Sequence, residues 1–106
     1  MTNKTKSVYT LIVQVGRSKN DGLPAGSTGA GLLCYASGID EPEAVRETVA
    51  ILKQADLAPL DVTGYGTVED RLTGGEEISE EELNLMDRAE KENSVIVAQM
   101  TPFFEN

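Results

Sequence analysis

Residues Val8–Val15, with the sequence VYTLIVQV, decide the fold. The odd-numbered positions from Tyr9 to Val15 are all apolar, whereas Thr10 and Gln14 interrupt the even-numbered set. A period of two is typical of a β-strand that buries one side well and the other only in part. The stretch therefore predicts a β-strand with one well-buried side, and the rest of the chain is assigned around it.

A glycine-rich stretch separates this strand from the next apolar segment, Leu32–Ser37 (LLCYAS), which we expect to return antiparallel beside it. Five glycines and a proline lie between positions 16 and 31, which predicts a long surface loop at the tip of a hairpin. The alternative is an anion site at Gly26–Gly31 with Arg17 and Lys19. Phosphate-binding loops normally precede a helix, whereas these glycines precede a strand, so we favour the hairpin tip.

Two helices have clear start signals. Asp40 can cap a helix at the amide of Glu43, with Pro42 in the first turn, and helical periodicity continues to about residue 55. The pair Ser79 and Glu82 forms an S-x-x-E capping box, followed by a narrower apolar stripe that extends to about residue 92.

The remaining segments are shorter. Residues 60–65 are β-branched enough for a third strand, and residues 67–72 fit either a helical turn capped by Thr67 or an extension of that strand. Residues 94–101 predict a last strand, ended by Pro102, and because 95–98 are apolar on both faces we expect this strand to be central.

The order β-β-α-β-α-β predicts a single α+β domain spanning residues 1–106. We expect a two-layer sandwich, with a mixed sheet of four to five strands and two helices on one face. An additional short strand near residues 76–78 would make it a ferredoxin-like variant.

Composition excludes several classes of chemistry. The chain has no histidine and one cysteine, Cys34, so Ser–His and Cys–His nucleophile pairs, histidine-ligated metal sites, cysteine cages and intrachain disulfides are ruled out. We expect no cofactor, no metal and a buried, unreactive Cys34. The net charge of −9 argues against nucleic acid as a partner, and the absence of a long apolar run argues against a membrane and for a cytoplasmic protein.

Carboxylates are abundant, and most have a structural explanation as helix caps or solvated charges. Only Glu69, Asp70 and Arg71, with Tyr65 just upstream, follow a strand in a stretch where binding residues commonly lie. These four residues are the candidate small-molecule pocket, and a solvated turn is the competing interpretation.

Charge is unevenly distributed along the chain. The first 19 residues carry four basic groups and no acid, whereas residues 69–92 carry ten acids against three basic groups. Such a surface either only solubilises the protein or steers a basic partner. Phe103 and Phe104 either fold back onto the core or contact a second copy.

These features favour a non-catalytic binding or protein-interaction module that acts as a homodimer, because two helices on one face would leave an apolar sheet face uncovered. One alternative is an antitoxin-type or immunity-type protein that neutralises a basic partner. Another is a small enzyme or small-molecule binder with a pocket at the dimer interface. Nothing in the sequence positively indicates catalysis.

Overall fold

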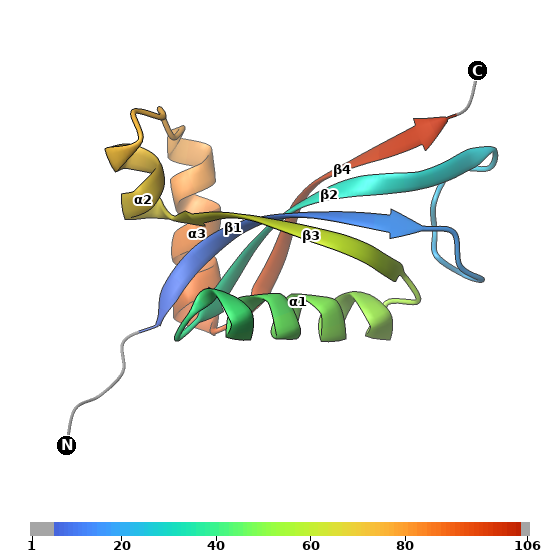
Figure 1. The fold of residues 1–106 in the computed structure, drawn as a ribbon, viewed down its shortest axis with the longest axis horizontal. Coiled ribbons are helices and arrows are strands. Elements are labelled where there is room, and N and C mark those ends of the chain that lie inside the picture. Colours follow the sequence, from blue (N-terminus) through green and yellow to red (C-terminus); the bar gives the residue numbers. More distant parts are fainter. Residues whose placement is uncertain (1–5, 105–106) are drawn as a thin grey trace.

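The computed structural model describes residues 6–104, which form one four-stranded sheet with three helices (Figure 1). The strands occur in the spatial order β3-β1-β2-β4. In chain order the elements are β1 (Ser7–Gly16), β2 (Ser27–Gly38), α1 (Glu41–Gln54), β3 (Ala58–Thr67), α2 (Val68–Thr73), α3 (Glu80–Glu92) and β4 (Val95–Phe104).

The α+β class is confirmed, but the sheet is antiparallel rather than mixed. All three strand pairs, β1 with β2, β1 with β3, and β2 with β4, are antiparallel. The α1 connection carries the chain from β2 past β1, so β2 and β3 run in the same direction but never become neighbours. Residues 76–78, which would supply the extra strand of a ferredoxin-like variant, lie in the connection between α2 and α3.

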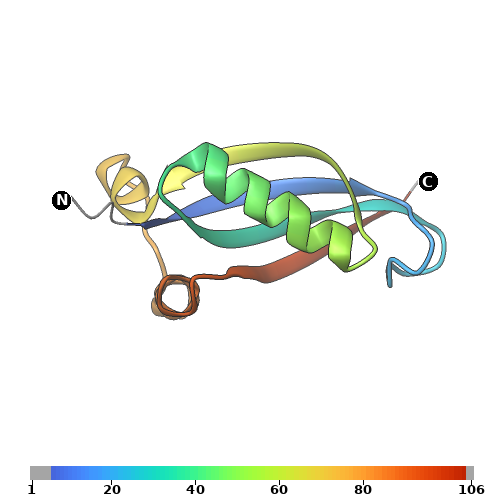
Figure 2. The ribbon, with the colours of Figure 1, turned by 90° about the horizontal axis from the view of Figure 1, so that it is seen from below.

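The helices are placed differently from the expected single layer. Leu11 and Val13 of β1 pack with Ala44 and Leu52 of α1, whereas Val8 packs with residues of α3. Because successive side chains of a strand point to opposite faces, α1 and α3 cover opposite faces of the sheet. Figure 2 shows α1 lying along the strands, with α3 at one end of the sheet.

The α3 side of the sheet is covered over only part of its length. The axis of α3 crosses the strands near one end, and the other ends of all four strands extend beyond α2 and α3 (Figure 1). The molecule is therefore elongated, with a Cα radius of gyration of 14.4 Å against about 13 Å for a compact domain of this length. None of the helices in the described part of the chain is long and apolar enough to cross a membrane.

The predicted loop at 16–31 is wrong over residues 27–31, because β2 already begins at Ser27. Gly29 comes so close to β1 that a Cβ placed on it would overlap the carbonyl oxygen of Val15. Glycine at position 29 therefore lets two strands approach closely. The number of glycines in a stretch does not show whether they serve close strand approach or a loop. The same pairing removes the predicted anion site, since Gly29 and Gly31 are ladder residues flanked by β1 and β4.

The last strand also differs from expectation. β4 pairs only with β2 and is an edge strand, not a central one. It continues through Pro102, which lies opposite Ala30, to Phe104. Proline is tolerated at an edge because its missing N–H can face solvent.

Candidate functional site

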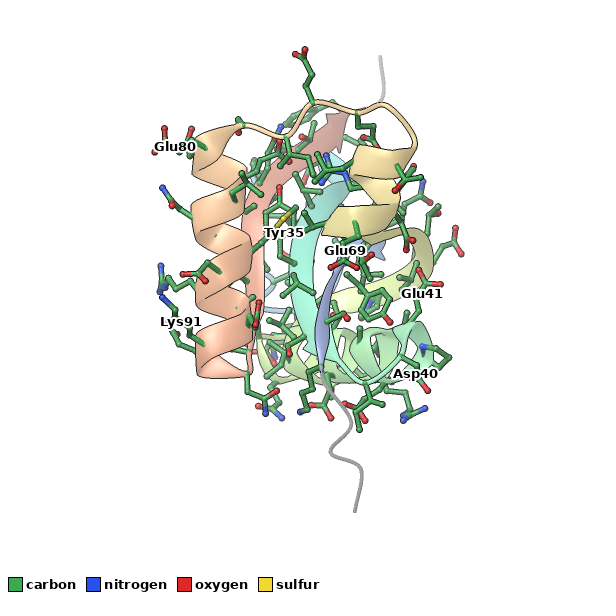
Figure 3. All side chains as sticks on the ribbon, turned by 90° about the vertical axis from the view of Figure 1, so that its left-hand side faces the viewer. Tyr35, Asp40, Glu41, Glu69, Glu80 and Lys91 are labelled. Carbon is green, nitrogen blue, oxygen red and sulfur yellow. The ribbon has the colours of Figure 1, made fainter. Side chains whose placement is uncertain are left out.

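A groove of about 410 Å³ lies between the start of β1, the start of α2 and one face of α3. Its floor contains Val8 and Met86, and its rim carries Lys6 together with acidic side chains. Figure 3 views the molecule from this end, with Glu69 of α2 and Tyr35 of β2 between the two helices. The lining residues are Lys6, Ser7, Val8, Thr67, Val68, Glu69, Leu83, Met86, Asp87 and Glu90.

The two helices that border this groove each begin at a capping box. The Thr67 hydroxyl accepts a hydrogen bond from the amide of Asp70, whose carboxylate accepts one from the Thr67 amide in return. Ser79 and Glu82 make the same reciprocal pair at the start of α3. Each box satisfies otherwise unpaired amides at a helix start, so the local sequence fixes where both helices begin.

A polar network lies between the two helices and joins them to the sheet. The hydroxyl of the fully buried Tyr35 donates to Oε1 of Glu82 at 2.7 Å. Arg71 donates from Nη2 to the same oxygen at 3.5 Å and from Nη1 to the hydroxyl of Thr10 at 3.1 Å. Its Nε donates to Glu76 at 3.3 Å. The network therefore links β1, β2, α2 and α3 through one guanidinium group.

The hydrogen bonds of this network stabilise fixed protonation states of Tyr35 and Glu82. Burial, supported by the bond to the Glu82 carboxylate, raises the pKa of Tyr35 to about 12. That same hydrogen bond from Tyr35 holds the pKa of Glu82 below its usual value. Tyr35 therefore stays protonated and Glu82 stays ionised at neutral pH, so neither side chain is poised to exchange a proton with a substrate.

The four residues of the predicted pocket do not converge. Glu69 lines the groove, but Asp70 is occupied by the cap of α2. Arg71 is almost buried, with a side chain 10% exposed, and its donors are engaged inside the network. Tyr65 lies exposed on β3 and is not among the groove residues.

Arg17 and Lys19, the two basic candidates of the predicted loop, do not form a common site. Arg17 folds over the turn between β1 and β2, where it pairs with Asp21 at 2.9 Å and donates to the carbonyl oxygen of Ser27 at 2.7 Å. This pairing, together with two backbone amides, lowers the pKa of Asp21 to about 2. Lys19 is exposed. Arg17 is thus a structural residue of the loop.

Cys34 is buried, as its apolar neighbours predict. Burial raises the pKa of its thiol to about 11, which keeps it as an unreactive thiol. Within residues 6–104, no group of three or more cysteine or acidic side chains could hold a metal ion.

From the sequence, we missed Thr10 and Tyr35 as members of the network. We also assigned Glu82 only to the capping box and missed its bond to Tyr35. Thr10 appeared only as a polar interruption in a strand, and Tyr35 as one more apolar residue. A tyrosine inside a strand that is buried on both faces does carry a signal, because its hydroxyl needs a partner. Its partner lies 47 residues away, so local pattern could not name it.

The fold and the groove define a small α+β protein with an open groove between β1, α2 and α3. Residues 8–104 match the family model described as domain of unknown function (DUF8846). The chain belongs to this family. Searches of curated proteins and of solved structures found no match.

Proposed function

We propose that the protein is a non-catalytic interaction module that functions as a homodimer, joined along the free edge of β4. The observation that carries this proposal is the chemistry of that edge. Residues Val95–Phe104 contain no charged side chain, and charged side chains are one of the devices that protect an exposed strand edge.

Exposed apolar side chains accompany the uncharged edge. Val97 and Met100 are each 42% exposed, Phe103 is 41% exposed and Phe104 is 56% exposed. Val97 lies opposite Cys34 and Met100 opposite Leu32, which places both on the α1 side of the sheet, where α1 itself lies mainly over the other strands (Figure 2). Val97 and Met100 therefore form an apolar strip on the α1 side of β4, beside its unpaired backbone, while Phe103 lies on the other side against Gly31.

The other edge of the sheet is less suited to pairing. β3 reads APLDVTGYGT and includes one proline, one aspartate and two glycines, all residues that weaken strand pairing. β4 contains one proline, Pro102 near its end, and neither aspartate nor glycine. The difference favours β4 over β3 as the joining edge.

A second copy of the chain is the partner that fits the free edge of β4 best. A two-fold axis beside β4 would pair the strand with itself in antiparallel fashion and extend the sheet to eight strands, with the same apolar residues on both sides. The net charge of −9 opposes contact between copies over most of the surface, so a neutral edge is where two copies repel each other least.

The test is the molar mass in solution, measured by size-exclusion chromatography with light scattering. We expect twice the 11.4 kDa chain mass for the wild type. Met100→Lys, which puts a charge on the strip, should shift the protein to 11.4 kDa. Leu60→Lys is the matched control, since it changes a 73% exposed residue on β3 and should remain dimeric. A monomeric wild type, or loss of the dimer only in Leu60→Lys, would overturn the proposal.

A second candidate function is neutralisation of a basic protein by the acidic surface of α3. It is supported by three acids in the first turn, Glu80–Glu82, and by exposed acids farther along the helix. Arg88 and Lys91 are already paired with acids of the same helix, at 3.0 and 2.9 Å. Affinity for such a partner should fall steeply with salt, and salt-independent affinity would exclude this function.

A further inference from the structure

A second cavity lies on the opposite side of Lys6 from the groove, where α1, the end of α3 and the start of β4 meet. It has a volume of about 260 Å³. It is lined by Lys6, Ser37, Glu47, Ile51, Asn93, Ser94 and Val95. Its size suits a ligand smaller than a drug-sized molecule, whose pockets usually measure roughly 300–1,000 Å³.

Two unpartnered hydroxyl groups line this cavity. The side-chain oxygens of Ser37 and Ser94 are buried, and neither has a hydrogen-bond partner in the structure. Ser37 is only 5% exposed. Buried hydroxyl groups are normally hydrogen-bonded. The two serine hydroxyl groups therefore need hydrogen-bond partners from a molecule bound in the cavity.

The cavity also carries opposite charges. The Nζ of Lys6 donates to Oδ1 of Asn93 at 2.7 Å and lies 3.8 Å from Glu43, which leaves donors of the ammonium group free. Glu47 is an exposed residue of α1 at the rim of the cavity, and it has no ion-pair or hydrogen-bond partner within residues 6–104. The C-terminal end of α3, capped by Asn93, adds partial negative charge on the side of the cavity that it borders.

We propose that this cavity binds a small zwitterion of the amino-acid class. The carboxylate of the ligand would accept from Lys6 and from the hydroxyl groups of Ser37 and Ser94. Its ammonium group would face Glu47 of α1. A simple carboxylate would leave Glu47 without a counter-charge, and a simple amine would leave both hydroxyl groups without a charged acceptor. Ile51 and Val95 provide apolar contacts for a short aliphatic side chain. This inference does not depend on the homodimer.

The test is a titration of the full chain with L-valine, followed by amide chemical shifts. Isovalerate, which lacks the ammonium group, and isobutylamine, which lacks the carboxylate, are the matched ligands. We expect saturable shifts at Ser37, Asn93 and Ser94 with L-valine, and at least about tenfold weaker binding of either analogue, because each loses a charged contact.

Variants separate binding from folding. Ser37→Ala and Ser94→Ala each remove an orphan hydroxyl, so the free protein should stay folded while affinity for L-valine falls about tenfold. Ser7→Ala, which changes a serine of the other cavity, should bind L-valine like the wild type. Absence of saturable shifts with all three compounds would mean that the cavity holds only water and would overturn the proposal. Equal affinity for L-valine and isovalerate would also overturn it.

Discussion

The hydroxyl of Tyr35 donates a 2.7 Å hydrogen bond to Oε1 of Glu82, a residue that also closes the capping box of α3 through its other oxygen. One carboxylate thus sets where α3 begins and fastens that helix to β2. The same oxygen accepts from Arg71 of α2. The position of both helices above the sheet therefore depends on a contact that spans half of the chain.

Removal of the Tyr35 hydroxyl tests this contact. We expect Tyr35→Phe to lower the free energy of unfolding by about 1.5–3 kcal/mol, the usual contribution of a hydrogen bond to a charged group. Urea denaturation of Tyr35→Phe, Glu82→Gln and the double variant gives the coupling between the two side chains. The double variant should be less destabilised than the sum of the single variants, and simple additivity would show that the bond contributes nothing.

Acid should destabilise the protein partly through Asp21. Its pKa is lowered in the folded state from 3.8 to about 2, mainly by the hydrogen bond from Arg17. A lowered folded-state pKa contributes stability above pH 3.8, and this contribution is lost as the pH falls toward 2. The lowered pKa of Glu82 acts with the same sign.

The control for this acid effect is Asp21→Asn. Urea midpoints of the wild type should fall between pH 4 and pH 2, which spans the folded and unfolded pKa values of Asp21. The variant should be less stable at neutral pH and should show a shallower fall over the same interval. Parallel curves for the two proteins would contradict the assigned role of the Arg17 and Asp21 pair.

The close approach of β2 to β1 predicts that one added methyl group at position 29 strongly lowers stability. Gly29→Ala would place a Cβ against the carbonyl oxygen of Val15, so we expect destabilisation of at least about 2 kcal/mol. Gly74→Ala is the matched control, because there the nearest atom outside the adjoining residues is 3.4 Å away, an ordinary contact. Thermal melts that rank the two variants in the opposite order would show that the strand pairing at Gly29 is misassigned.

Cys34 should resist modification in the native protein. Its side chain is fully buried, and burial raises the pKa of its thiol to about 11. Reaction with a disulfide reagent should therefore follow the rate of unfolding and accelerate in urea. Rapid labelling in native buffer would show that β2 opens at this position.

The sequence predicted local features well. The caps at Asp40, Thr67 and Ser79 depend on residues three positions away, and all three occur in the structure. Strand order depends on long-range pairing, which the pattern of residues 95–98 could not supply, so an edge strand looked central. Gly29 was taken for part of the loop because its role lies in its distance to β1, whereas Gly22 and Gly26 do adopt the positive φ typical of turns.

The candidate site was predictable only in part. Glu69 does line a groove, but Asp70 and Arg71 serve folding, because their partners are a cap residue and side chains brought in from β1 and α3. Tyr65 extends from β3, away from that groove. Tyr65 and residues 69–71 were assigned to one pocket because they are close in sequence. They belong to different elements, since β3 ends at Thr67 and α2 begins at Val68.

The most direct test of the central claim is amide hydrogen exchange along β4, measured at low and high protein concentration. A homodimer joined along this strand predicts that outward-facing amides between Val97 and Thr101 exchange more slowly at high concentration, while those at the free edge of β3 do not change. Exchange in β4 that is independent of concentration, in a sample of monomeric mass, would contradict the account.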